Sequence, residues 1–179
     1  MKRSAFALLC VALCACAGVK RNFAPADPLS ADDHFRLGAA LEAHGLPNDA
    51  LKHYSRAVKL NPSNPEAWVA LGNLKFKLGD FAAAEEDYRR ALDRSPFHAG
   101  AQNNLALTYL AQNKNLKEAE LLAKAALRQN GALRPYVLDT LANIYEREGR
   151  LPEARLAAEQ AAAAAASNGI TLPPKPESL

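Results

Sequence analysis

The chain has no cysteine after its sixteenth residue, because Cys10, Cys14 and Cys16 all lie at the start of its 179 residues. No disulfide and no thiolate metal site can therefore form among the residues that follow. A strong charge of one sign is missing too, since 22 basic and 19 acidic residues leave a net charge of +3. That charge is too small for the basic footprint of a nucleic-acid-binding protein, so we expect no nucleic acid partner.

Motifs for catalysis are missing as well. The sequence contains no HExxH, no G-x-S-x-G, no Walker loop and no dinucleotide fingerprint. Its four histidines, His34, His44, His53 and His98, form no i, i+4 pair that could share a metal. We therefore expect that the protein is not an enzyme and that it holds neither a cofactor nor a metal ion.

An apolar run long enough for a transmembrane helix is also absent. The uncharged stretch from Ser4 to Val19 has 16 residues, whereas a spanning helix needs roughly 18 or more. The stretch follows Lys2 and Arg3, and its apolar part runs over residues 5–13. This order of a basic and then an apolar segment is typical of a secretory signal peptide.

Two cleavage sites are compatible with this signal. The run Leu13-Cys14-Ala15-Cys16 resembles a bacterial lipobox, which implies removal of residues 1–15 and lipidation of Cys16 with palmitate-type chains. Gly18 would then imply sorting to the outer membrane of a Gram-negative envelope, facing the periplasm. The alternative is an A-x-A site, Ala15-Cys16-Ala17, that is cut before Gly18 and leaves a soluble periplasmic or secreted protein.

The rest of the chain divides into three parts. Residues 16–29 contain two prolines and no helical pattern, which predicts a flexible tether. Residues 30–168 carry a repeated helical pattern. Residues 169–179 are rich in proline, and we expect this tail to be disordered.

The helical part repeats with a period of 34 residues. Shifting residues 31–64 onto residues 65–98 superposes Leu37-Gly38 on Leu71-Gly72 and Tyr54 on Tyr88. With one extra residue near Lys114, the register continues through units 99–134 and 135–168. Three positions in every unit are glycine or alanine: Gly38, Ala50, Ala57; Gly72, Ala84, Ala91; Ala106, Ala119, Ala126; Ala142, Ala154, Ala161.

The period and the motif Trp68-x2-Leu71-Gly72 resemble the tetratricopeptide repeat family over residues 31–167. His34 and Gln102 stand where the family has tryptophan, and Lys75 stands where it has tyrosine. The resemblance implies an all-α fold, an α-solenoid of four helix hairpins with about eight helices. It also implies a concave groove, built mainly from the first helix of each hairpin, that binds other proteins.

Helix-end signals agree with eight helices, which we place at residues 31–44, 48–60, 65–78, 81–94, 99–112, 116–129, 135–148 and 152–167. Ser30 and Asp33 form a capping-box pattern, and Asn64, Asp80 and Asn115 are expected N-caps. Gly45, Gly79 and Gly149 are expected to supply the left-handed turn residue between paired helices.

The family's groove positions imply the candidate binding residues of this chain. They are Asn73, Phe76, Lys77, Asn103, Leu107, Leu110, Tyr136, Asp139, Asn143 and Arg147. An asparagine side chain both donates and accepts hydrogen bonds, so three asparagines along one face could pair with the backbone of an extended ligand. The alternative is that these side chains only solvate the concave wall.

Two further features have competing interpretations. The run Ala161–Ala166 could pack on a second copy and produce a homo-oligomer, or it could simply form a stable terminal helix. The charged run Glu85-Glu86-Asp87 is expected to be a solvated helix face.

Together these observations favour a lipid-anchored, non-catalytic scaffold of the bacterial envelope. It would bind an extended or helical segment of an envelope protein and assist complex assembly, as the similar type IV pilus biogenesis lipoproteins do. Two alternatives are an accessory subunit of an envelope peptidase or secretion machine, and a self-assembling structural lipoprotein.

Overall fold

The computed structural model describes residues 27–129 and 131–172. The signal peptide, Cys16, most of the expected tether and residues 173–179 of the tail lie outside the described residues. Within the described part every regular element is a helix: α1 (Ala31–Ala43), α2 (Pro47–Leu60), α3 (Pro65–Lys77), α4 (Phe81–Arg94), α5 (Ala99–Ala111), α6 (Leu116–Leu127), α7 (Arg134–Arg147) and α8 (Leu151–Ser167). The expected all-α fold is confirmed, with helix ends within two residues of those expected.

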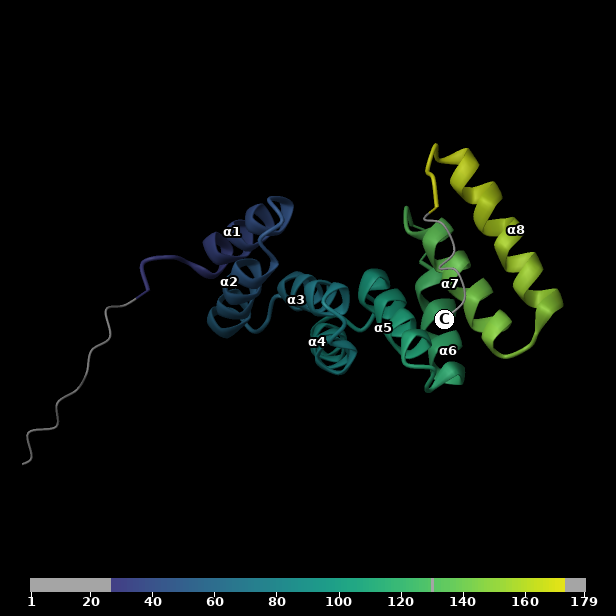
Figure 1. The fold of residues 1–179 in the computed structure, drawn as a ribbon, viewed down its shortest axis with the longest axis horizontal. Coiled ribbons are helices and arrows are strands. Elements are labelled where there is room, and N and C mark those ends of the chain that lie inside the picture. Colours follow the sequence, from purple (N-terminus) through teal and green to yellow (C-terminus); the bar gives the residue numbers. More distant parts are fainter. Residues whose placement is uncertain (1–26, 130, 173–179) are drawn as a thin grey trace, which may run out of the picture.

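The helices form four hairpins that stack along one axis (Figure 1). Each second helix packs on the first helix of the next hairpin, and the first helices α3, α5 and α7 also contact one another in order. The hairpin of α1 and α2 lies at one end, and the hairpin of α7 and α8 lies at the other (Figure 1). This arrangement is the expected α-solenoid.

Most of the expected helix ends are confirmed. The Ser30 hydroxyl accepts from the backbone of Asp33, and Asn64 and Asp80 cap α3 and α4. Asn115 occupies the N-cap position of α6 as expected, but its backbone is left-handed (φ 51°) and its side chain makes no capping hydrogen bond. The third hairpin has no glycine in its turn and one extra residue, so Asn113 and Asn115 both take the positive φ that asparagine tolerates.

The small positions let the paired helices approach closely. In the first two hairpins a glycine of the first helix faces a tyrosine ring of the second, Gly38 against Tyr54 and Gly72 against Tyr88. A Cβ on Gly72 would lie 2.7 Å from Cε1 of Tyr88, closer than atoms can pack. In the third and fourth hairpins alanine replaces that glycine, and an alanine of the second helix stands where the tyrosine was.

The position where the family has tryptophan keeps one structural role. The indole N–H of Trp68 donates to the Pro62 carbonyl at 2.9 Å, and the Gln102 amide donates to the Pro96 carbonyl at 2.8 Å. Each bond holds the loop that precedes its own hairpin. Gln102 therefore replaces tryptophan as a donor, although it supplies less apolar surface.

The N-terminal end of the solenoid is closed by Asp27. Its Oδ2 contacts Nε2 of the buried His34 at 2.9 Å and accepts from Arg56 Nε at 2.7 Å. His34 Nδ1 also lies 2.9 Å from Nδ1 of His53. The hydrogen bond from Arg56 is the largest cause that lowers the pKa of Asp27 to about 2, so the carboxylate stays ionised at neutral pH.

The charged run on α4 is not a uniformly solvated face, so that expectation is wrong in part. Asp87 is only 3% exposed, and its Oδ2 lies 2.6 Å from Nζ of Lys75 on α3. Burial raises the pKa of the Asp87 carboxyl against the lowering effect of Lys75. Asp87 faces α3 because it precedes the core residue Tyr88 and lies three residues after Ala84, on the same side of the helix.

The longest helix of the described residues, α8, has 17 residues. In the part of the chain that the structure describes, no helix combines the length and apolar character that crossing a membrane requires.

We expect the substitution Gly72→Ala to destabilise the protein. Alanine normally gains about 1 kcal/mol over glycine in a helix, but here the new methyl group must displace the buried Tyr88 ring, at a cost of about 1–3 kcal/mol. Urea unfolding monitored by circular dichroism should therefore show a lower midpoint for this variant. The matched control is Gly131→Ala, whose Cβ meets nothing within 4 Å, and an unchanged midpoint for both variants would contradict the packing described here.

Candidate functional site

A small hollow lies between the first helices α3 and α5, with one residue of α4 at its floor. Its volume is about 170 Å³, and its lining residues are Asn73, Phe76, Lys77, Tyr88, Asn104 and Leu107. A hollow of this size is below the roughly 300–1,000 Å³ of pockets that enclose whole small-molecule ligands. It therefore suits a single side chain of a larger ligand.

The polar part of the hollow is organised around Asn73. Its Oδ1 accepts hydrogen bonds from the Tyr88 hydroxyl at 2.9 Å and from the Asn104 amide at 2.7 Å. Burial raises the pKa of Tyr88 well above its ordinary value, so this hydroxyl remains a donor. The two donors fix the orientation of the Asn73 amide and direct its NH2 group away from them.

The hollow can therefore offer one donor and one acceptor side by side. The donor is the NH2 of Asn73, and the acceptor is Oδ1 of Asn104, which receives only a long 3.5 Å contact from Asn103. A peptide group carries one carbonyl acceptor and one N–H donor, so the two amides match the backbone of an extended segment. Phe76 and Leu107 supply apolar surface beside them.

An ion pair forms one rim of the hollow. Lys77 Nζ lies 2.6 Å from Oε1 of Glu42 on α1, and Oε2 of Glu42 accepts from the Tyr54 hydroxyl at 3.0 Å. Burial and the neighbouring Glu42 carboxylate raise the pKa of Tyr54 to about 12. Because the Lys77 side chain is mostly exposed, the pair adds little to stability and could open for a ligand.

Most of the groove residues expected on α3 and α5 lie at this hollow or beside it. Asn73, Phe76, Lys77 and Leu107 line it. Leu110 lies further along α5, half-buried against the core.

Asn103 lies elsewhere. It is 5% exposed, and its Oδ1 has no hydrogen-bond partner among the described residues. The structure places the next residue, Asn104, in the hollow in its stead.

The other four expected residues form a separate group on α7. Tyr136 is 37% exposed, Asn143 donates to Oδ2 of Asp139 at 3.2 Å, and Arg147 lies at the end of the helix. None of the four lines the hollow between α3 and α5. Asn73 and Asn143 therefore do not meet in one cluster.

The candidate binding residues taken from the sequence leave out three residues of the site: Tyr88, Asn104 and Glu42. Tyr88 was a visible repeat position, and its ring packs against Gly72, which carries its hydroxyl to the neighbouring Asn73. The signal for Asn104 was the pair Asn103-Asn104, in which a helix can direct only one side chain to a given face.

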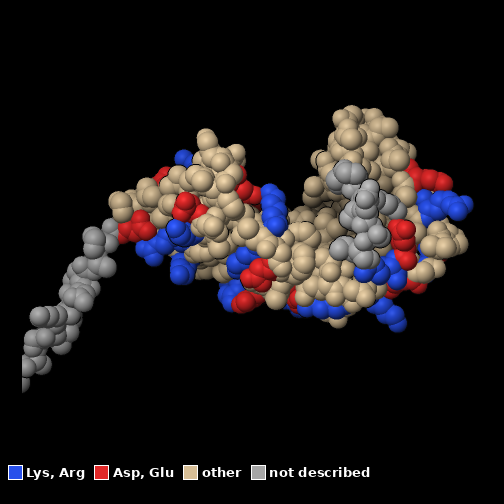
Figure 2. All heavy atoms as spheres, in the orientation of Figure 1, with Lys and Arg blue, Asp and Glu red and all other residues tan. Residues whose placement is uncertain are grey.

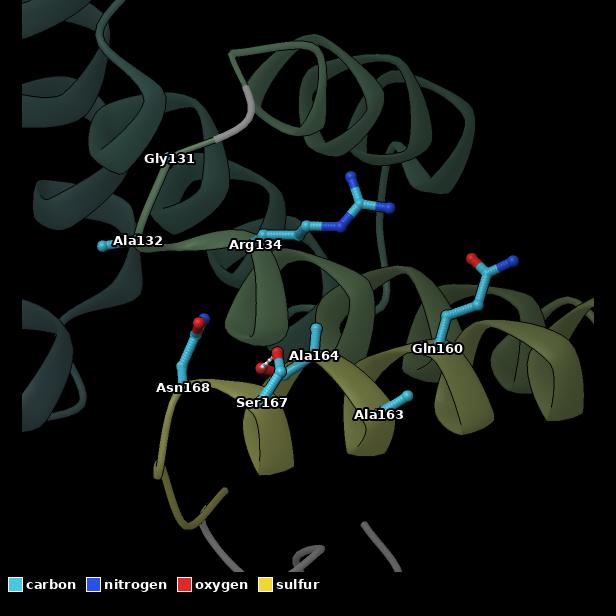
Figure 3. Close-up of a pocket in the computed structure, with 8 residues that line it drawn as sticks. All are labelled: Gly131, Ala132, Arg134, Gln160, Ala163, Ala164, Ser167 and Asn168. Carbon is cyan, nitrogen blue, oxygen red and sulfur yellow. Dashed lines mark hydrogen bonds between the residues drawn. The ribbon is translucent and has the colours of Figure 1, made fainter.

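A second, larger hollow of about 610 Å³ lies between α8 and the loop before α7 (Figure 3). Small and polar side chains line it: Gly131, Ala132 and Arg134 on the side of the loop, and Gln160, Ala163, Ala164, Ser167 and Asn168 on the side of α8 (Figure 3). In the second hairpin, Arg94 donates to the carbonyl of Pro62 in the equivalent loop, at 3.1 Å, and in the third Gln129 donates to the carbonyl of Phe97.

Ala164 occupies the equivalent place in the fourth hairpin, three residues after the small position, and cannot donate. The hollow is therefore the space that a donor side chain fills in the second and third hairpins. It lacks the large apolar surface of a ligand pocket.

The inner side of the molecule is hollowed between its two ends (Figure 2). Lys, Arg, Asp and Glu gather mainly along the opposite side and at the ends, and a basic group with an acidic group beside it lies on the margin of the hollowed side (Figure 2). A partner on the inner side would therefore be held by amide hydrogen bonds and apolar contacts more than by charge.

Comparison with known families agrees with the repeat. Residues 69–135 match a family model described as "Tetratricopeptide repeat", and residues 48–79 match one described as "TPR repeat". Among solved structures, MamA is similar with a TM-score of 0.70 and 24% identity, over 80% of this chain and 83% of that chain. A thermophilic TPR protein of Thermus thermophilus is similar with a TM-score of 0.65 and 28% identity, over 75% of this chain and 74% of that chain.

Curated relatives share only part of their length with this chain. Tetratricopeptide repeat protein 14 of Mus musculus is 31% identical over 52% of this chain and 11% of its own length. Protein O-mannosyl-transferase TMTC1 of Homo sapiens is 48% identical over 46% of this chain and 9% of its own. The photosystem I assembly protein Ycf3 of Cyanophora paradoxa is 31% identical over 48% of this chain and 51% of its own.

We expect the substitution Ala164→Gln to stabilise the fourth hairpin. A glutamine at this position can donate to the loop before α7, as Gln129 does one hairpin earlier. One such bond contributes about 1 kcal/mol, so the thermal midpoint should rise. The control is Ala162→Gln, the same substitution at an exposed residue of α8 that does not line the hollow, and equal midpoints for the two variants would contradict this explanation of the hollow.

Proposed function

Because the chain is a tetratricopeptide repeat protein, we propose that it is a non-catalytic scaffold that holds an extended segment of another protein on its inner side. The hollow between α3 and α5 is the proposed centre of this contact. One side chain of the segment enters the hollow, and a peptide group beside that side chain pairs with the amides of Asn73 and Asn104.

The observation that carries the proposal is the saturation of Asn73 Oδ1 by two internal donors. An asparagine that only solvated the wall would need no fixed orientation. Here Tyr88 and Asn104 orient the amide so that its NH2 group remains for a ligand carbonyl. Recognition through the peptide backbone gives affinity for extended segments without reading much of their sequence.

The proposed role is assistance in assembling a larger complex. The photosystem I assembly protein that this chain resembles over half of its own length supports such a role. We further propose that the scaffold acts in the bacterial envelope, at the outer membrane facing the periplasm, as type IV pilus biogenesis lipoproteins do. The sequence of residues 1–16 supports this location, with Cys16 as the lipid attachment site.

We expect the substitution Asn73→Asp to weaken partner binding and to leave the fold intact. Aspartate keeps an oxygen that accepts from Tyr88 and Asn104, but it loses the NH2 donor to the ligand. Loss of one such hydrogen bond should lower capture about three- to tenfold. The measurement is photo-cross-linking in cells from an unnatural amino acid at Lys77, followed by mass spectrometry of the attached protein.

Asn48→Asp is the matched control, because it adds the same charge at an exposed residue of α2 far from the hollow. Cross-linking from Lys117, exposed on α6, controls for random encounter. Equal yields of the same adduct from the Asn73→Asp and Asn48→Asp proteins would overturn the proposal.

We expect the substitution Cys16→Ser to abolish lipid attachment. A chain expressed in a Gram-negative host should incorporate labelled palmitate, because acylation takes place on the thiol and new N-terminus of Cys16. The label should disappear in Cys16→Ser and persist in the control Cys14→Ser. A wild-type protein that carries no label and begins at Gly18 would show that the alternative cleavage site is used.

A further inference from the structure

The last helix has a side face that the solenoid leaves uncovered. The second helices α2, α4 and α6 are each covered by the first helix of the next hairpin, and α8 stands at the end of the stack (Figure 1). The face of α8 that corresponds to those covered faces consists of Leu151, Arg155, Ala158, Ala162 and Ala166, here called the α8 side face, and all of these residues are exposed except Ala158, which is half-buried against the core. The three existing junctions indicate what such a face binds.

An ion pair recurs at two of these junctions. Glu85, which follows the small residue Ala84 on α4, lies 2.8 Å from Nζ of Lys114 in the turn of the next hairpin. Glu120, which follows Ala119 on α6, lies 3.0 Å from Nη1 of Arg150 in the turn after α7. Both junctions therefore place a carboxylate on the second helix and a cation directly after the left-handed turn residue of the next hairpin.

On α8 the sign of this charge is reversed. Arg155 follows the small residue Ala154 and stands where Glu85 and Glu120 stand. It is exposed and makes no ion pair with any residue of the described part of the chain. A helix that covered α8 in the register of a next hairpin would therefore need a carboxylate, not a cation, opposite this position.

The α8 side face also has smaller apolar side chains than the corresponding faces of α2, α4 and α6. Val58, Leu92 and Leu127 follow the third small position of their helices and pack into the core clusters beside the next hairpin. Ala162 takes this place on α8 and is exposed, and Leu151 is 61% exposed at the start of the same face. Large apolar side chains of the occupant would fill the space that alanine leaves.

The residues that follow α8 do not supply a helix for this face. Pro173, Pro174 and Pro176 follow α8, and three prolines within four residues prevent a covering helix. The described residues before α1, 27–30, lie at the opposite end of the stack (Figure 1).

A second copy stacked head to tail also fails to match Arg155. Its α1 would be the covering helix, and Leu46 would stand where Lys114 and Arg150 stand in the existing junctions. Arg155 would then gain no carboxylate. The capping-box residue Asp33 at the start of that α1 would instead approach the carbonyl end of α8, which is unfavourable for a negative charge.

We infer that the α8 side face binds an amphipathic helix of a partner protein. The helix lies antiparallel to α8, as α7 does to α6, with large apolar side chains on Ala158 and Ala162. A carboxylate just after its C-terminal end pairs with Arg155. This interaction surface is distinct from the hollow between α3 and α5 and does not depend on the function proposed for that hollow.

Charge exchange with a synthetic probe tests the inference. The probe is a fluorescent peptide of residues 65–80 of this chain, the covering helix α3 with Asp80 directly after its turn glycine. Its counterpart carries Asp80→Lys. Fluorescence anisotropy with the purified chain at low ionic strength should show about fivefold tighter binding of the Asp80 peptide, the effect of about 1 kcal/mol from one exposed charge pair.

The variant Arg155→Glu should reverse this preference, and Arg128→Glu, which removes a cation at the end of α6, should leave it unchanged. Ala162→Glu should weaken both peptides, because it places a charge in the apolar part of the face. If the Arg155→Glu protein still bound the Asp80 peptide more tightly than the Asp80→Lys peptide, the inference would be overturned. A wild-type dimer in sedimentation that Ala162→Glu dissociates would overturn it as well, because it would assign the face to a second copy.

Discussion

Close approach of paired helices depends on which side of each pair carries the aromatic ring. In the first two hairpins the ring belongs to the second helix, and only glycine fits opposite, since even a methyl group would overlap Tyr54 or Tyr88. In the last two hairpins the rings of Tyr109 and Tyr145 come from the first helix, and alanines occupy the positions of the earlier tyrosines. Every hairpin thus contains a buried tyrosine, which comes from the second helix in the first two hairpins and from the first helix in the last two.

The same constraint creates the polar centre of the candidate site. A ring held flat against Gly72 leaves the Tyr88 hydroxyl at Asn73, and the equivalent ring against Gly38 brings the Tyr54 hydroxyl to Glu42. Where the tyrosine belongs to the first helix instead, its hydroxyl has a different partner. The Tyr109 hydroxyl, for example, donates to Oε1 of Glu118 at 3.3 Å. A tyrosine hydroxyl therefore orients the asparagine amide of Asn73 in the second hairpin, and the other three hairpins do not repeat this arrangement.

The 34-residue period predicted the fold because small residues, turn glycines and helix caps are local features that recur at a fixed spacing. Eleven of the twelve small positions are buried, and Ala154 is half-buried because no further hairpin covers α8. The site was less predictable. Adjacent helical residues differ by about 100° in direction, so a small error in the register exchanges Asn103 for Asn104. The burial of Asp87 could not be read from the sequence either, because it depends on a partner, Lys75, twelve residues away on another helix.

The exposed end of the described stack differs from the junctions inside it. The junction pairs Glu85–Lys114 and Glu120–Arg150 would let hairpins of this kind continue, because each second helix presents the charge that the next turn binds. Arg155 presents the opposite charge, so a further hairpin with a cation at its turn would be repelled at the end of α8. The terminal helix thus differs from its predecessors in both charge and side-chain size. With these two changes, the exposed face of α8 suits a covering helix whose sequence differs from the first helices of this chain.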